Sequence, residues 1–120
     1  SFEQELADLF EQREQVEAKV LALGNRMEKQ LKLKSLDLKV WPGIGYAFKV
    51  SKRDEAQLRK QKVRYQVVNM KNDGVRFRTP ELTPLAEQFA ELSKEYQARQ
   101  QRLIDKLLEV SAGYLPVIQA

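Results

Sequence analysis

The side chains of this sequence that could do chemistry are its lysines and arginines, and they gather in the middle of the chain. Residues 32–79 contain thirteen Lys and Arg against four Asp and Glu, whereas the two flanking parts contain eight basic and thirteen acidic residues. Such a local excess of positive charge indicates a polyanionic partner. The chemistry that it predicts is contact with phosphate oxygens, which ammonium and guanidinium groups bind through charge and hydrogen bonds.

Other chemistries are not supported by the residue types. The chain contains no Cys and no His, so we expect no disulfide, no zinc site of the Cys/His kind and no histidine base. Its five glycines do not form a phosphate-binding loop motif. Pairs of carboxylates such as Glu87 and Glu91 have helical spacing, and we interpret them as solvated helix faces. We therefore expect no catalytic residues, no cofactor and no metal in this chain.

Length and composition indicate a single globular domain. The 120 residues are 42% hydrophobic and 32% charged, which is too polar for a membrane span and too apolar for disorder. No uncharged run approaches the ~20 residues of a transmembrane helix, and no signal-peptide pattern opens the chain. Because the sequence begins at Ser1 without a methionine, we expect a piece of a longer protein.

Two heptad patterns flank the basic middle and predict two long helices, each about 40 Å long at ~1.5 Å per residue. The first pattern runs through Phe2, Leu6, Leu9, Val16, Val20, Leu23 and Met27, with Arg13 in its one gap. The second runs through Leu85, Phe89, Leu92, Tyr96, Arg99, Leu103, Leu107 and Val110. Thr79-Pro80 or Thr83-Pro84 should begin the second helix, and Gly113, followed by Pro116, should end it.

Each predicted helix has a single apolar stripe. Two such helices can bury both stripes by folding back on each other, which predicts an antiparallel coiled coil. Alignment of the two patterns places Arg13 opposite Arg99, and two facing guanidinium groups are costly to bury. We expect them to reach toward Glu14, Glu17 or Glu95, or to mark a place where another part of the protein packs.

The middle of the chain predicts a small β-module. Residues 36–40 and 46–50 alternate in polarity as half-buried strands do, and the turn 41–45 separates them. Residues 53–61 predict a short helix or an ordered loop. One face of the resulting sheet should be apolar and the opposite face basic.

A second hairpin is predicted from residues 64–70 and 74–78. Its turn contains Asn, Asp and Gly, which tolerate positive φ. Val75 and Phe77 should face one side of the sheet, and Arg76 and Arg78 the other. The aromatic side chains of the module could stack on bases, but we expect them to pack: Trp41, Tyr46, Phe48 and Phe77.

The predicted fold class is α+β: a long antiparallel two-helix coiled coil with a small antiparallel β-sheet module inserted at its tip. The expected parts are a first helix over residues 1–31, a basic β-module over 32–79, and a second helix with the start of the following segment over 80–120. This arrangement would hold positive charge at the end of an acidic stalk.

Six residues of the module are the candidate ligands for a phosphate backbone: Lys49, Ser51, Lys52, Arg53, Lys71 and Asn72. Backbone binding requires donors and positive charge spread along a surface, without base-edge geometry. A strand places Lys49 and Ser51 on one side, ~6.6 Å apart. A single lysine at a β-tip commonly serves only to block edge pairing, so the prediction depends on the patch as a whole.

Several segments resemble the clamp region of the MutS family of mismatch repair proteins, most closely its eukaryotic MutS homologue 2 branch. They are GYAFKV at 45–50, NMKNDGVRF at 69–77, and a closing run with ELTPL at 81–85, Glu95-Tyr96 and Ser111–Tyr114. The likeness covers residues 43 to 118, and the first helix fits the lever helix that precedes the clamp.

The resemblance implies a clamp between two lever helices that contacts the sugar–phosphate backbone of duplex DNA without sequence specificity. Lys49 matches a basic position at the end of the second clamp strand, and Lys71-Asn72 matches a Lys-Asn pair at the hairpin tip. For the parent protein it implies an ATPase that uses ATP and Mg outside this chain, a heterodimer with another MutS homologue, and a nuclear location.

Two alternatives remain open from the residues. A prefoldin-like chaperone subunit also places β-hairpins between antiparallel helices, but its assembling strands should be largely uncharged. A structural coiled-coil spacer would have no use for the positive charge of the module.

Overall fold

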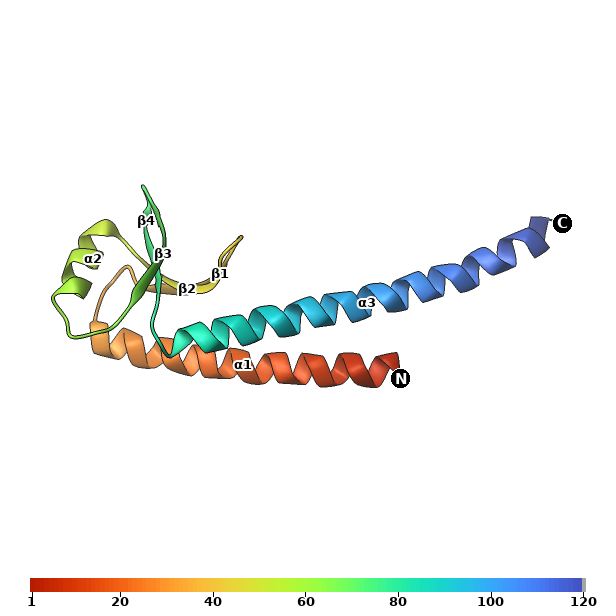
Figure 1. Cartoon of the computed structure of the whole chain (residues 1–120), viewed down its shortest axis with the longest axis horizontal. Coiled ribbons are helices and arrows are strands. Elements are labelled where there is room, and N and C mark those ends of the chain that lie inside the picture. Colours follow the sequence, from red (N-terminus) through yellow and green to blue (C-terminus); the bar gives the residue numbers. More distant parts are fainter. Residues whose placement is uncertain (120) are drawn as a thin grey trace.

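Over residues 1–119 the chain forms three helices and a four-stranded antiparallel sheet, an α+β fold 74 Å long and 29 Å by 19 Å across. The computed structural model describes the backbone of residues 1–119 and the side chains of residues 1–110. The two long helices, α1 (Phe2–Leu31) and α3 (Leu82–Gln119), lie beside each other. The sheet and the short helix α2 (Lys52–Arg59) lie near one end of this pair (Figure 1). The predicted fold class is therefore confirmed at the level of α+β.

Helix α1 (Phe2–Leu31) begins at the N-cap Ser1, whose hydroxyl accepts from the Gln4 amide, and ends where Lys32 adopts a left-handed conformation. Its buried face contains five residues of the predicted stripe and one residue a turn further on, whereas Phe2 and Leu6 of the stripe are only half-buried. The buried residues are Leu9, Val16, Val20, Leu23, Met27 and Leu31. Gly24 lies inside the helix because a β-carbon there would come within 2.8 Å of the Leu38 Cδ2 atom. The glycine thus lets the first strand pack closely on α1.

Helix α3 (Leu82–Gln119) begins at the first of the two predicted caps. The Thr79 hydroxyl and carbonyl accept from the backbone of residues 82 and 83. The predicted end at Gly113 is wrong, since the helix continues through Gly113 and Pro116 to Gln119. Glycine can adopt helical angles at a cost of about 1 kcal/mol, and one proline removes one N–H donor without forbidding helical φ.

Helices α1 and α3 run antiparallel, and the last turns of α1 extend beyond the start of α3 (Figure 1). Contacts join the end of α1 to the start of α3, through Arg26 and Glu81, and the start of α1 to the middle of α3, where Lys106 lies over the Phe2 ring. Each helix contributes apolar side chains to one continuous core.

The predicted pairing of Arg13 with Arg99 is wrong, and so are the carboxylate partners proposed for them. Arg13 lies over the rings of Phe10 and Tyr96, with its Cζ atom 4.9 Å from the Tyr96 centroid. Arg99 donates to Glu5, with 2.6 Å between Nη1 and Oε2. A shift of about one helical turn from the predicted register separates the two guanidinium groups and gives each its own partner.

The sheet has the strand order β1-β2-β4-β3, with every neighbouring pair antiparallel: β1 (Asp37–Trp41), β2 (Gly45–Val50), β3 (Gln66–Lys71) and β4 (Gly74–Arg78). The short helix α2 (Lys52–Arg59) connects β2 to β3, so of the two predicted alternatives for that segment the helix is correct. A bulge between Val67 and Asn69 interrupts the pairing of β3 with β4.

One face of the sheet forms the core with the helices. Phe48 lies opposite Phe77 and Val50 opposite Val75, all fully buried, and the two phenyl rings stack at 5.4 Å. Tyr46 contacts Phe89 of α3 edge to face at 4.8 Å, so the packing predicted for these aromatic residues is confirmed. The sheet therefore lies against the side of the helix pair.

Trp41 has a different position from the other aromatic residues. It lies on the outer face of the sheet, where its indole N–H donates to the Ala47 carbonyl at 2.9 Å. Ala47 beneath it is completely buried. Trp41 thus packs as predicted, but it covers the outer face and not the core.

Candidate nucleic-acid interface

The six predicted ligands are brought to one end of the sheet. Val50 pairs with Val75, so the end of β2 and the start of α2 lie next to the β3–β4 turn. Lys52 and Arg53 are exposed in the first turn of α2, and Lys71 and Asn72 are exposed at the turn. Their environments nevertheless differ in one respect that matters for binding, which is whether their charge is already compensated.

Lys49 is compensated within the module. Its ammonium lies 3.2 Å from an Asp73 oxygen and 5.6 Å from the centre of the Trp41 ring, and only 25% of its side chain is exposed. Arg76 donates to both oxygens of the same Asp73 and lies 4.6 Å from the Trp41 ring. These two cations hold the pKa of Asp73 down to about 2, with Arg76 the larger cause.

The basic outer face predicted from alternation in β4 is present, but its arginines are engaged. Arg76 is buried between Asp73, Asn69 and Trp41. Arg78 donates to the carbonyls of Tyr46 and Ile44 at 2.7 and 2.5 Å. Both arginines hold strands together, so they contribute little donor capacity to an external anion.

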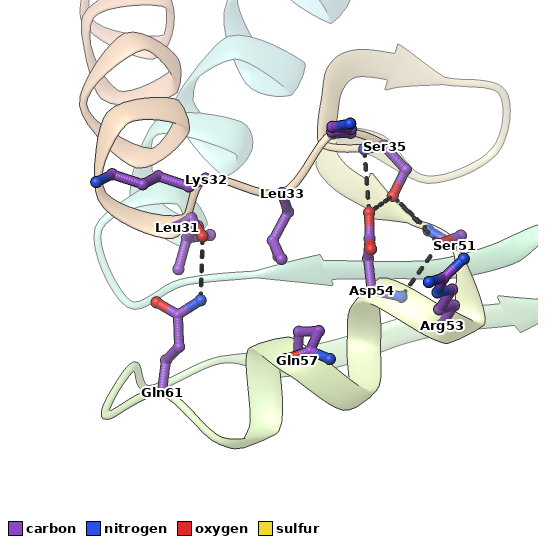
Figure 2. Close-up of a pocket in the computed structure, with 10 residues that line it drawn as sticks. Leu31, Lys32, Leu33, Ser35, Ser51, Arg53, Asp54, Gln57 and Gln61 are labelled. Carbon is purple, nitrogen blue, oxygen red and sulfur yellow. Dashed lines mark hydrogen bonds between the residues drawn. The ribbon is translucent and has the colours of Figure 1, made fainter.

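Ser51 acts in the structure as the N-cap of α2. Its hydroxyl accepts from the Asp54 amide at 3.1 Å, and its own amide donates to the Ser35 hydroxyl at 2.9 Å (Figure 2). Ser35 in turn donates from its amide (3.1 Å) and its hydroxyl to Asp54 Oδ2. These hydrogen bonds lower the pKa of Asp54, and they fix the start of α2 to the connection between α1 and β1.

A buried carboxylate in the first turn of α2 ties this helix to the segment before β3. Glu55 is almost completely buried, accepts a hydrogen bond from Tyr65 at 3.0 Å, and is paired with Arg59. The hydrogen bond from Arg59 is the main cause that lowers the pKa of Glu55, whereas burial raises the pKa of Tyr65. The first turn of α2 is therefore tied to two other segments of the chain, which places the cationic side chains Lys52 and Arg53 on an ordered element.

A groove of about 620 Å³ lies between the end of α1 and helix α2 (Figure 2). Basic side chains line it from two directions: Lys32 and Lys34 from the connection after α1, and Arg53 from α2. Sequence reasoning counted Lys32 and Lys34 in the basic patch but did not select them as ligands. The signal in the sequence that could have identified them is their place directly after the first heptad pattern. A chain that leaves a helix through a left-handed residue turns sharply, which here brings the two lysines to the groove beside α2.

Two other features are absent from the described residues. No group of three or more His, Cys, Asp and Glu side chains within that part of the chain is arranged to hold a metal ion. None of the helices, over the residues that were described, has a stretch long and apolar enough to cross a membrane.

Comparison with known proteins gives one family. The family described as MutS family domain IV matches residues 1–95. The chain is 27% identical over 123 aligned positions to the DNA mismatch repair protein MSH2 of Arabidopsis thaliana, an alignment that covers 99% of the chain and 13% of that protein. It is 26% identical to the DNA mismatch repair protein spellchecker 1 of Drosophila melanogaster, covering 95% of the chain and 13% of the relative.

A third relative is more similar over a shorter part. The DNA mismatch repair protein Msh2 of Dictyostelium discoideum is 34% identical over 74 positions, which cover 62% of the chain and 8% of that protein. The chain thus spans only about an eighth of the length of the first two relatives.

Proposed function

Because this chain belongs to the MutS family and contains its domain IV, we propose that it is the DNA-binding clamp, with its flanking lever helices, of a DNA mismatch repair protein. The proposed parts are the first lever helix over 1–31, the clamp module over 32–79, and the second lever helix with the start of the following segment over 80–120. In this proposal α1 and α3 form an antiparallel coiled coil that carries the clamp. The chain itself has no enzymatic activity.

The clamp contacts the sugar–phosphate backbone and does not read bases. The observation that carries this proposal is the gathering of uncompensated cations, together with Asn72, at one end of a rigid module in a chain of this family. Side chains of these types bind phosphate oxygens through charge and donate hydrogen bonds without base-edge geometry. The proposed ligands are Lys52, Arg53, Lys71 and Asn72, with Lys49 and Ser51 in supporting positions.

The remaining proposals concern the whole protein. The similarity to DNA mismatch repair proteins of a plant, a fly and a slime mould supports a eukaryotic parent protein. We propose that this parent binds ATP with Mg in a domain outside this chain, forms a heterodimer with another MutS homologue, and acts in the nucleus.

A titration of the isotope-labelled chain with duplex DNA, followed by amide NMR shifts at low ionic strength, tests the proposed function. A perfectly paired duplex and one containing a mismatch should shift the same amides, around residues 52–53 and 71–72, with equal affinity. Affinity should fall with salt by about 0.9 logarithmic units per neutralised phosphate. No shift with either duplex, combined with suppression of the aggregation of an unfolded protein, would support the chaperone alternative instead.

A further inference from the structure

We infer that the groove between the end of α1 and helix α2 is a second contact site for the phosphodiester backbone, in which Lys32, Lys34 and Arg53 are the ligands. This inference rests on the proposed function and goes further, because it locates an additional contact on the α2 side of the module, away from the outer face of the sheet. It adds two lysines that neither the sequence pattern nor the family resemblance selects.

The pairing of charges within the module is the first argument. Three cations on the outer face of the sheet already form ion pairs with carboxylates of the module. Lys39 pairs with Asp37, and both Lys49 and Arg76 pair with Asp73. By contrast, Lys32, Lys34 and Arg53 have no carboxylate within 4 Å among the side chains that the structure describes. On the sheet face, an external phosphate would compete with these carboxylates for the cations. At the groove, no carboxylate in the described part of the chain forms an ion pair with the three cations, so this competition is absent.

The shape of the groove is the second argument. Lys32 comes from the end of α1, with its side chain extending away from Arg53, which comes from the start of α2. Gln57 and Gln61 line the groove on the α2 side (Figure 2). The Gln61 amide donates to the Leu31 carbonyl at 3.1 Å, so this side is tied to the end of α1. Cations that are set apart in this way suit an extended anion such as a nucleic-acid strand better than one small anion.

The groove also contains an acidic side chain, Asp54, which must be taken into account. Its Oδ2 atom accepts from the amide and the hydroxyl of Ser35, so the carboxylate is committed to the connection between α1 and β1. The charges of Arg53 and Lys34 contribute to lowering its pKa without forming an ion pair. Three cations and one carboxylate therefore line the groove, and its net charge is positive.

The left-handed Lys32 and the capped start of α2 make this arrangement rigid. Lys32 has φ of 55° and its amide donates to the Glu28 carbonyl, so the chain leaves α1 at a fixed angle. The hydrogen bonds among Ser35, Ser51 and Asp54 then fix the opposite wall. A site that is already ordered loses less conformational entropy when it binds.

The test compares three variants of the complete chain by NMR titration with duplex DNA. The groove variant carries Lys32→Gln, Lys34→Gln and Arg53→Gln. The control carries Lys19→Gln, Lys94→Gln and Arg102→Gln, which remove the same charge from exposed positions on the long helices. The third variant, Lys71→Gln, reports on the hairpin tip alone. Amide spectra and thermal unfolding verify that each variant keeps the fold.

The groove variant should bind duplex DNA at least about tenfold more weakly at low salt. Its affinity should also depend less on salt concentration, by the amount expected for the loss of about two to three phosphate contacts. The control variant should change little in both respects. Equal losses in the groove variant and the control would overturn the inference, because net charge alone would then explain the effect. If only Lys71→Gln weakens binding, the groove is not a contact site and the proposed function stands.

Two further outcomes are decisive. An absence of any shift when the unaltered chain is titrated with duplex would overturn the proposed function together with the groove. Inorganic phosphate alone should shift the groove amides only weakly. If it saturates them as the duplex does, the groove is a site for small anions and the inference of a strand contact is wrong.

Discussion

The ammonium of Lys49 lies 3.2 Å from a carboxylate oxygen of Asp73, across the boundary between strand β2 and the β3–β4 turn. The same carboxylate receives two hydrogen bonds from Arg76, and the Trp41 ring lies against both cations. Lys49 is one of the residues that the family resemblance matches to positions of the clamp, together with the pair Lys71-Asn72. In the proposed function, a phosphate would compete with Asp73 for Lys49, so this carboxylate would weaken the binding of DNA.

Replacement of Asp73 by Asn should therefore strengthen binding to duplex DNA. The change removes one negative charge and releases Lys49, which corresponds to about one additional phosphate contact and a severalfold gain in affinity at low salt. Fluorescence anisotropy with a labelled duplex measures the effect. Asp105→Asn, on the exposed side of α3, is the matched control and should have a much smaller effect. Weaker binding by a folded Asp73→Asn variant would contradict the prediction.

Asp73 should also make stability depend on acidic pH. Its pKa is about 2 in the folded chain against an ordinary value of 3.8, so the folded state binds this proton more weakly than the unfolded state. The stabilisation is therefore fully present above pH 3.8 and is lost as the pH falls toward 2. Urea unfolding measures the free energy of unfolding of the unaltered chain and of Asp73→Asn. The difference between these two free energies should become smaller as the pH falls from 3.8 toward 2. A constant difference would show that the ion pairs contribute nothing.

Gly74 should not tolerate a side chain. It has φ of 143°, and a β-carbon there would come within 2.3 Å of the Val50 carbonyl oxygen, so Gly74→Ala should separate β4 from β2. We expect the free energy of unfolding to decrease by more than about 2 kcal/mol, because the cost of the strained backbone and the cost of the broken strand pairing add to each other. Gly43→Ala is the control, because Gly43 also has positive φ but an added β-carbon would have open space around it. It should cost about 1–2 kcal/mol, and similar losses for both would contradict the steric argument.

The hydrogen bond from Tyr65 to Glu55 should stabilise α2 measurably. Tyr65→Phe keeps the ring, which packs against Phe77 at 5.3 Å, and removes only the hydroxyl from a buried carboxylate. The expected cost is about 1–3 kcal/mol, typical of a hydrogen bond to a charged group. Chemical denaturation measures it, and hydrogen exchange of the α2 amides should increase. Unchanged exchange in α2 would indicate that Glu55 is held by Arg59 alone.

The two long helices should depend on their apolar stripe far more than on their ion pairs. Leu23→Ala removes a fully buried side chain and should cost about 2–5 kcal/mol. Arg99→Gln breaks the ion pair with Glu5, which is partly exposed on both sides, and should cost less than about 1 kcal/mol. Thermal unfolding in low and in high salt compares the stabilities of the two variants with that of the unaltered chain. At high salt the loss of stability should disappear for Arg99→Gln and persist for Leu23→Ala. A larger cost for Arg99→Gln would assign the pairing of the helices to charge.

The sequence by itself determined the elements of this protein and the sides that its strands present. Heptad spacing is a local property of the chain, so it predicted α1 and the start of α3, and alternation predicted that Val75 and Phe77 face the core. The excess of positive charge in residues 32–79 is likewise a matter of composition. These inferences hold because each depends on residues that are close together in the chain.

Only the tertiary structure decided which of those charges are available. Whether Lys49 is free depends on Asp73 and Arg76 of the β3–β4 hairpin and on Trp41 of β1, which meet it through the register of the sheet. The same holds for Arg13 and Arg99, whose partners changed with a shift of one helical turn between α1 and α3. Ion pairs act over a few ångströms in space, irrespective of separation along the chain, and a count of charges cannot assign them.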